Sequence, residues 1–137
     1  MYHNNEGVTA TGTAIIGHFD PAGRTLTWTS AGHPSPVLVR QGKATLLDHS
    51  PCVMMGAFES MSYELTTTVL ESGDVLVLYT DGIVERRGLD VQAGLDALVG
   101  AAADCHTDDP EESIACVLAR LDGDISDDVC VIALRVL

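Results

Sequence analysis

Short apolar and β-branched runs separated by turn residues fill the first half of the chain. Residues 9–19 ("TATGTAIIGHF") and 24–30 ("RTLTWTS") flank the turn residues 20–23 ("DPAG"), so the pattern predicts a β-hairpin. Residues 37–41 ("VLVRQ") and 44–48 ("ATLLD") form a second pair of runs around a glycine. These four runs predict strands, because β-branched and aromatic residues recur in them at a period near two.

Two more strands are expected before residue 81. Residues 62–70 ("SYELTTTVL") and 74–80 ("DVLVLYT") lie on either side of the turn sequence "ESGD". Residues 49–60 show no period and predict a loop.

The apolar period changes to that of a helix after Asp81. One helix is predicted from apolar residues at helical spacing, which are Val91, Leu95, Leu98, Val99 and Ala102. A second helix is expected to start with Asp109 as its cap and Pro110 in its first turn, and to end near Gly123. Its expected apolar face comprises Ile114, Val117, Leu118 and Leu121.

The chain closes on residues 128–137 ("DVCVIALRVL"), a nearly continuous apolar run. Such a run predicts a central strand that is covered on both faces, since an edge strand would alternate. A block of strands, two helices and a last strand predict an α+β sandwich and not a βαβ repeat. We expect residues 1–8 to be a loose lead-in and residues 9–137 to form a single domain.

Composition narrows the classes of partner. The chain has 137 residues, of which 46 % are hydrophobic and 20 % charged, so a single folded core is expected. Its net charge is −13, which argues against nucleic acid and against an anionic membrane as partners, because both require a basic surface. No apolar stretch approaches the length of a membrane span, and no secretion signal is visible.

The four cysteines are widely spaced and form no C-x-x-C pair, which argues against a structural zinc site. They are Cys52, Cys105, Cys116 and Cys130. Three of them lie in apolar surroundings, so we expect reduced core residues of a cytosolic protein.

Two acidic positions lie where an apolar strand meets a loop. Asp81 follows the strand at 74–80, and the pair Asp127 and Asp128 precedes the last strand. If these strands are antiparallel neighbours, the carboxylates meet at one rim of the sheet, where Mg²⁺ or Mn²⁺ would find oxygen ligands. Gly82 would allow close approach of backbone to the ion. From the pattern alone, a plain D-G turn and a polar loop explain these residues equally well.

Five stretches in a fixed order give a family resemblance. They are "LTWTSAGHPSPVLVR", "MMGAF", "ESGDVLVLYTDG", "YTDGIVERR" with the residues after it, and "SDDVCVIALR". Together they resemble the SpoIIE/RsbU-type branch of the PPM (PP2C-like) metal-dependent protein phosphatases. The resemblance runs from about Thr9 to the end of the sequence.

The resemblance implies a PP2C-like β-sandwich of mainly antiparallel strands flanked by helices. It also implies hydrolysis of phosphoserine or phosphothreonine with two Mn²⁺ or Mg²⁺ ions in a cytoplasmic bacterial protein that regulates a sigma factor. Asp81 and Asp127 match catalytic metal ligands, with Gly82 beside the metal and Asp128 orienting water or a ligand. The expected substrate is a phosphorylated anti-anti-sigma (STAS) protein.

One departure from the family pattern stands out. The family begins with a strand carrying a G-D-x-x-D motif, whose first aspartate bridges the two metals, and helices follow it; this sequence has no such motif. We therefore expect the last two-thirds of the domain, without its N-terminal strand and helices, and doubt activity of this chain alone. A non-catalytic module that binds a STAS protein or an anti-sigma kinase is the alternative. An exposed sheet edge or apolar surface would invite homodimerisation.

Three further residues are candidates for contact with phosphate or a partner. His33 lies between glycine and proline, and we favour a structural role in which it bonds neighbouring backbone. Arg86 and Arg87 are two of only seven bases, and either an anion contact or a solvated loop explains them.

Overall fold

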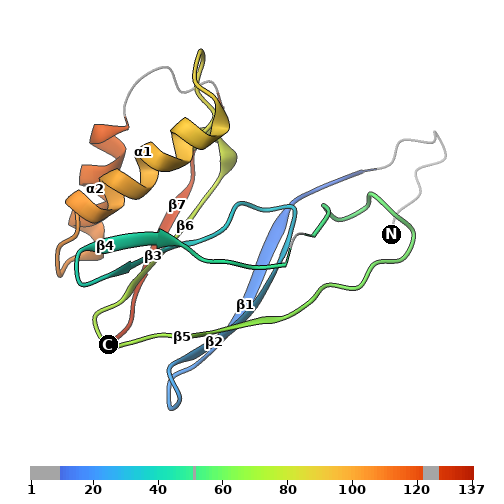
Figure 1. Ribbon diagram of the computed structural model, residues 1–137, viewed down its shortest axis with the longest axis horizontal. Coiled ribbons are helices and arrows are strands. Elements are labelled where there is room, and N and C mark those ends of the chain that lie inside the picture. The colour runs from blue at the N-terminus through green and yellow to red at the C-terminus, as the bar shows by residue number, and fades with distance from the viewer. Residues whose placement is uncertain (1–9, 51, 122–126) are drawn as a thin grey trace. The chain divides into compact units, whose positions relative to one another are not determined.

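The computed structural model describes most of the chain (Figure 1), namely residues 10–50, 52–121 and 127–137. The lead-in predicted for residues 1–8 and the helix end predicted at Gly123 lie outside these ranges. Within them the fold is α+β, as predicted, and its strands pair antiparallel. Two compact units can be distinguished, and each has a sheet of its own: Met1–His33 with Asp48–Leu70, and Pro34–Leu47 with Glu71–Leu137.

The first unit holds a three-stranded sheet of order β1-β2-β5. Strands β1 (Ala14–Asp20) and β2 (Thr25–Ala31) form the predicted hairpin. The Asp20 carboxylate closes the turn, because it accepts hydrogen bonds from the backbone amides of Ala22 at 3.1 Å and Gly23 at 3.3 Å. Strand β5 (Thr66–Val69) pairs with the other edge of β2.

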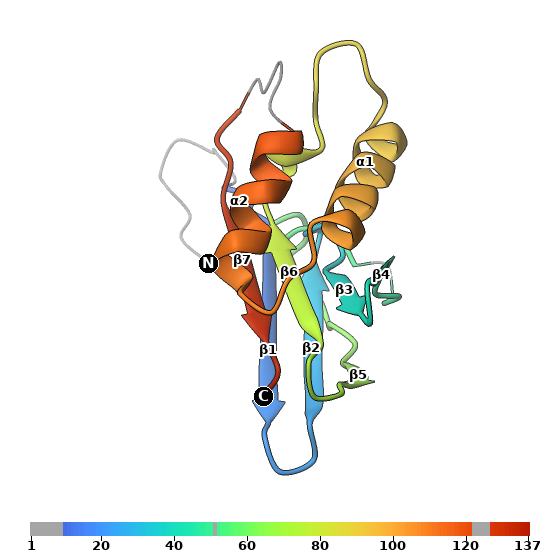
Figure 2. The ribbon, with the colours of Figure 1, turned by 90° about the vertical axis from the view of Figure 1, so that its left-hand side faces the viewer.

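The second unit holds a four-stranded sheet of order β4-β3-β6-β7. Its strands are β3 (Val37–Arg40), β4 (Lys43–Leu46), β6 (Val75–Tyr79) and β7 (Val131–Arg135). The turn "ESGD" therefore joins strands of two different sheets and closes no hairpin. Helices α1 (Val91–Asp104) and α2 (Pro110–Arg120) cover one face of this sheet, with α1 against β3 and β4 and α2 against β7 (Figure 2).

Both helices form where the apolar period predicts them. Asp109 caps α2 by accepting a hydrogen bond from the Glu111 amide at 2.9 Å, with Pro110 in the first turn. Val117 and Leu121 are buried in the core, but Leu118 is exposed, so its placement on the apolar face was wrong. No helix in the described part of the chain has the length and apolar character needed to cross a membrane.

The core of the second unit lies between the sheet and the helices. Alternate residues of β3 and β6 point into it, because side chains of a strand alternate between its two faces. They meet small and branched residues of the helices. The buried set is Val37, Val39, Val75, Val77, Tyr79, Ile83, Val84, Leu98, Ala101, Ala102, Cys105, Val117 and Leu121.

Strand β7 is the outermost strand of its sheet, which corrects the prediction of a central, doubly covered strand. It pairs with β6, and no other strand of the described chain pairs with its second edge. Val131 and Ala133 pack against the core, whereas Ile132 and Leu134 are 50 % and 52 % exposed. One face of β7 therefore packs on the core, and the other face is exposed.

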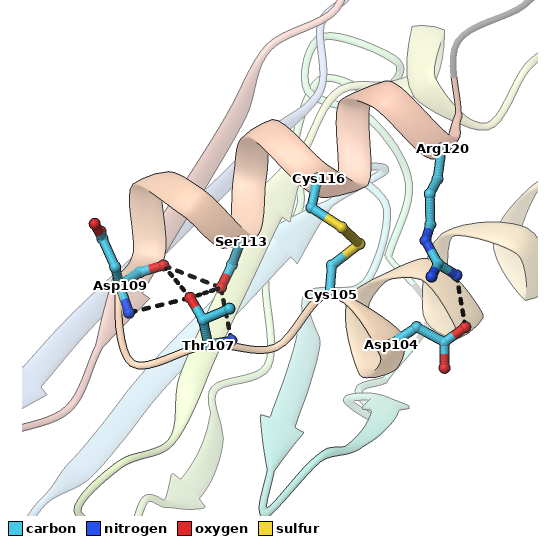
Figure 3. The surroundings of a disulfide bond; sticks show 7 residues. All are labelled: Asp104, Cys105, Thr107, Asp109, Ser113, Cys116 and Arg120. Carbon is cyan, nitrogen blue, oxygen red and sulfur yellow. Dashed lines mark hydrogen bonds and ion pairs between the residues drawn. A yellow bond between two sulfur atoms is a disulfide. The ribbon is translucent and has the colours of Figure 1, made fainter.

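A disulfide joins Cys105 to Cys116, which corrects the expectation of reduced cysteines. Figure 3 shows the bond linking the residue that follows α1 to the middle of α2. The two Cα atoms are 5.6 Å apart, within the usual range for a disulfide. Cys52 and Cys130 remain free thiols.

A buried ion pair ties β3 to the start of β6. The Asp74 side chain is only 2 % exposed and receives Arg40 in a forked geometry, with Nε–Oδ1 at 3.0 Å and Nη2–Oδ2 at 2.6 Å. The Glu71 amide also donates to Asp74 at 2.7 Å. Burial alone would raise the pKa of Asp74. The hydrogen bonds from Arg40 and the Glu71 amide, together with the charge of Arg40, outweigh this effect, so the pKa of Asp74 is lowered.

Candidate functional site

Strands β6 and β7 bring two acidic segments to one rim of the second sheet. They are antiparallel neighbours, with Tyr79 opposite Val131 as the last pair. The backbone amide of Thr80 extends this pairing by donating to the Cys130 carbonyl at 3.0 Å. Asp81 therefore leaves β6 where Asp128 approaches β7.

Thr80 fastens the two segments through its side chain as well. Its Oγ1 accepts a hydrogen bond from the Cys130 amide at 2.9 Å and donates to the Asp128 carbonyl at 3.3 Å. The motifs in the sequence did not single out Thr80. Its signal was a hydroxyl side chain at the end of an apolar strand, directly before the candidate ligand.

Gly82 fits against the other acidic segment so closely that no side chain could replace its hydrogen. A Cβ atom at this position would collide with the Asp128 carbonyl oxygen and would lie 3.1 Å from that of Asp127. Gly82 also lies in the short helix η1 (Asp81–Ile83) and is buried. Its role in the structure is therefore the close approach of two backbone segments.

The three carboxylate residues at this rim are exposed to solvent. Asp127 Oδ1 accepts a hydrogen bond from the Asp128 amide at 2.8 Å, which orients the Asp127 side chain. The Asp81 carbonyl accepts from the amides of Val84 and Glu85, so the backbone around Asp81 is a fixed turn.

The electrostatic influence of Asp81 reaches the buried Tyr79. The Tyr79 hydroxyl donates to the Ser35 carbonyl at 2.8 Å. Burial raises the pKa of Tyr79 to about 12, and the negative charge of Asp81 acts in the same direction. Tyr79 is thus a neutral hydrogen-bond donor at any physiological pH.

The side-chain donors at this rim are carboxylates, so the kind of cation they could hold can be considered. Mg²⁺ and Mn²⁺ prefer carboxylate oxygens and water, and Mg²⁺ is often held by only one or two carboxylates. Within the described ranges, no three Asp, Glu, His or Cys side chains gather closely enough to hold a metal ion. The described residues at this rim therefore do not fit a two-ion centre, and a single ion held by Asp81 and Asp127 stays a prediction.

His33 belongs to the first unit, in the loop after β2. Ser30 Oγ donates to the His33 carbonyl at 2.8 Å and accepts from its amide at 3.1 Å, so the loop backbone is fixed. The His33 Nδ1 atom lies 3.3 Å from Thr13 Oγ1. These bonds agree with the structural role that we favoured, while contact with phosphate stays a prediction.

Arg86 and Arg87 differ in their surroundings. The Arg86 guanidinium is partly buried, and its Nη2 donates to the backbone carbonyl of Leu121 at the end of α2. The expectation of a solvated loop is therefore wrong for Arg86. Arg87 is exposed, and an anion contact by either residue stays a prediction.

Solved structures of phosphatases share this fold. The RsbU and RsbW domains of Rv1364c from Mycobacterium tuberculosis match with a TM-score of 0.80 and 24 % identity, covering 90 % of this chain and 35 % of that one. The phosphatase domain of the cell fate determinant SpoIIE from Bacillus subtilis, presoaked with Mn, matches with a TM-score of 0.66 and 20 % identity over 90 % of this chain and 56 % of its own. The PPM Ser-Thr phosphatase MsPP from Mycobacterium smegmatis, in complex with cacodylate, gives 0.67 and 17 %, covering 96 % and 65 %.

These neighbours define the class of the fold, which is that of the PP2C-like phosphatase domains. Residues 1–137 match the family described as stage II sporulation protein E (SpoIIE), so the chain belongs to the SpoIIE family. The resemblance and the fold class predicted from the sequence are thereby confirmed. The chain spans between about a third and two-thirds of the length of these three structures.

Proposed function

We propose that the chain is the metal-binding part of a SpoIIE-type protein serine/threonine phosphatase. The observation that carries the proposal is the meeting of Asp81 with Asp127 and Asp128 at one rim, in a chain that belongs to this family. The proposed substrate is a phosphorylated anti-anti-sigma (STAS) protein, by family resemblance. The presoak of the Bacillus subtilis domain with Mn supports a divalent cation of this kind.

In this proposal Asp81 and Asp127 hold a Mn²⁺ or Mg²⁺ ion. A bound divalent cation supplies positive charge for the phosphoryl oxygens and acidifies water at neutral pH. The protein's own part is placement: Thr80 and Gly82 fix the two backbone segments together, and the Asp128 amide orients the Asp127 carboxylate. Catalysis with two ions would require at least one further carboxylate beyond those at this rim.

A second candidate function rests on that shortage of ligands. Because no three metal-binding side chains gather in the described part of the chain, a module that binds a STAS protein or an anti-sigma kinase without catalysis is the alternative. A cation could bind at the carboxylate rim in either candidate, so metal binding alone does not distinguish them. Metal binding and turnover must therefore be measured separately. A cytoplasmic location also stays a prediction, and the disulfide between Cys105 and Cys116 favours a more oxidising compartment.

The test compares Asp81→Asn with the wild type and with Glu85→Gln, an exposed acid of the same turn. We expect the wild type and Glu85→Gln to bind Mn²⁺ by calorimetry, and Asp81→Asn to lose that binding, because a carboxylate ligand becomes a neutral amide. Hydrolysis of a phosphoserine STAS protein is then assayed with and without Mn²⁺.

Two outcomes decide between the candidates. Mn²⁺-dependent turnover that disappears in Asp81→Asn supports the phosphatase. Mn²⁺ binding without turnover in the wild type would contradict catalysis by this chain and would favour the binding module. Equal Mn²⁺ affinity in the wild type and Asp81→Asn would show that Asp81 is not a metal ligand.

A further inference from the structure

Helix α2 is attached to the second unit by fewer buried side chains than helix α1. Within α2 the buried residue is Val117, whereas α1 buries Gly94, Leu98, Ala101 and Ala102. The favourable free energy of packing grows with the apolar area that a helix removes from water. Non-covalent packing therefore holds α2 less firmly than α1.

A small apolar pocket lies between α2 and the sheet that it covers. Its volume is about 20 Å³, and Ile114 and Val117 of α2 line it together with Val131 and Ala133 of β7. Side chains that face such a gap lose the attractive contacts that close packing would give them. The packing of α2 on β7 is therefore incomplete.

The polar links of α2 and of the turn before it are also weak. Arg120 pairs with Asp104, and Arg135 of β7 pairs with Asp108, and in each pair the carboxylate is exposed. Ion pairs in contact with solvent contribute little to stability. Arg86 adds a hydrogen bond at the C-terminal end of the helix.

The disulfide supplies a covalent link at the place where the packing is incomplete. Ala102 lies three residues before Cys105, and Val117 directly follows Cys116, and both of these neighbours line the pocket. The bond thus fastens the middle of α2 to the end of α1, which is the better buried helix. Docking of α2 on the sheet depends on this bond more than on any other contact of the described helix.

The bond can be reached from the side of α2. Cys105 is 2 % exposed, whereas Cys116 is only partly buried. A thiolate of a dithiol reductant attacks Cys116 Sγ, which breaks the bond to Cys105 and leaves that sulfur as a thiolate that takes a proton from water. The second thiolate of the reductant then attacks the reductant's own sulfur in the mixed disulfide, so Cys116 leaves as a thiol. Two electrons have passed from the dithiol to the protein.

We propose that the bond between Cys105 and Cys116 is a redox switch for the docking of α2. The bonded form holds the helix on β7, and reduction lets α2 leave the sheet while the rest of the second unit stays folded. This inference does not depend on the proposed metal site or on phosphatase activity. It differs from the usual effect of a disulfide, which restricts the unfolded chain and leaves the folded state unchanged.

The experiment measures amide hydrogen exchange before and after reduction with dithiothreitol. It uses Cys52→Ala/Cys130→Ala, in which the bonded pair are the remaining cysteines. We expect the amides of α2 to exchange at least about tenfold faster after reduction, and those of α1 and β3 to change by a clearly smaller factor. The variant Cys105→Ala/Cys116→Ala should show the reduced pattern without any reductant.

Asp104→Asn is the matched control, because it removes an exposed ion pair between the same two helices. It should change exchange in α2 by no more than about twofold. Oxidised dithiothreitol should restore the bond in the reduced protein and slow the α2 amides again.

Two results would overturn the proposal. If reduction accelerates exchange in α2, α1 and β3 by the same factor, or abolishes the fold as followed by circular dichroism, the bond acts on the whole unit and is no switch for α2. If the bond does not form again in the folded protein, the change is not reversible. Selective and reversible acceleration in α2 supports the switch, whether or not the chain binds Mn²⁺.

Discussion

Asp74 and Arg40 form an ion pair that makes the stability of the fold depend on pH. The pair lies at the opposite end of β6 from the candidate ligands. Asp74 stands at the start of the strand and Asp81 just beyond its end. The pair is well formed, because the forked Arg40 contact and the Glu71 amide satisfy an almost fully buried carboxylate. Its effect on stability is therefore open to a direct test.

We expect Asp74→Asn to lower the free energy of unfolding by about 2 kcal/mol at pH 7, less than for a fully buried pair because Arg40 is partly exposed. The pKa of Asp74 is lower in the folded protein than in the unfolded chain. Its contribution is thus fully present above the unfolded value of about 3.9 and is lost as pH falls through the folded value.

The measurement is urea unfolding of wild type and Asp74→Asn between pH 7 and pH 3. The difference between them should shrink below about pH 4, where the unfolded wild-type chain begins to bind a proton at Asp74 that the folded protein does not. Glu71→Gln is the control, because Glu71 is the exposed partner of Arg40 and should have a small effect. A difference that stays constant over this range would contradict the assigned pKa shift.

At the scale of the elements, the disulfide is the covalent link between the two helices. The bonded cysteines are 11 residues apart, and the surrounding turn is also held by Thr107, Ser113 and Asp109 (Figure 3). An ion pair of 2.7 Å between Arg120 and Asp104 adds a second, exposed link.

We expect the double variant Cys105→Ala/Cys116→Ala to lose about 2–3 kcal/mol of stability, because a loop of this length restricts the unfolded chain. Thermal unfolding with and without a reductant provides the measurement. Reductant should lower the melting temperature of the wild type and leave the double variant unchanged. The free-thiol variant Cys52→Ala controls for reactions of the other cysteines. A wild type indifferent to reductant would argue against the bond.

Elements with a local signal could be predicted from the sequence, and pairings between distant elements could not. The hairpin follows from Asp20 and its turn, and α2 from Asp109 and Pro110, because a cap or a turn acts within a few residues. The apolar run of β7 does not reveal whether a second neighbour exists, since the run looks the same at an edge. The disulfide and the bond from Arg86 to Leu121 depend on helix packing, which spacing alone does not give.

The candidate site was predictable to the same extent. The proximity of the Asp81 and Asp127 segments could be predicted, because antiparallel neighbours place the end of one strand beside the start of the other. Strands β6 and β7 are such neighbours. The contribution of Thr80 was missed, since it acts through a backbone group that lies 50 residues away.

At the scale of the whole molecule, the edge of β7 that pairs with no strand of the described chain bears on assembly. An unpaired edge with apolar neighbours is a template for pairing with another chain. Antiparallel pairing of two β7 strands about Ala133 would place Ile132 opposite Leu134 of the second copy. We propose this contact as the basis of the homodimer anticipated from the sequence.

Sedimentation velocity across a concentration series tests the dimer. The wild type should show a concentration-dependent dimer, and Ile132→Lys/Leu134→Lys should remain monomeric, because lysines at an edge oppose strand pairing. Leu118→Lys is the matched control, as it places the same charge on an exposed leucine of α2. A dimer that survives in the double lysine variant would rule out this edge.

The separation of β6 and β7 along the chain has a consequence for biosynthesis. Asp81 precedes along the chain the strand that brings Asp127 and Asp128 beside it, and α1 and α2 lie between. Contacts between segments so distant in sequence form late, because the intervening chain must first be ordered. On the ribosome, a nascent chain would hold Asp81 as a lone carboxylate until β7 emerges. In the proposed function, the cation site would therefore form only once β7 has paired with β6.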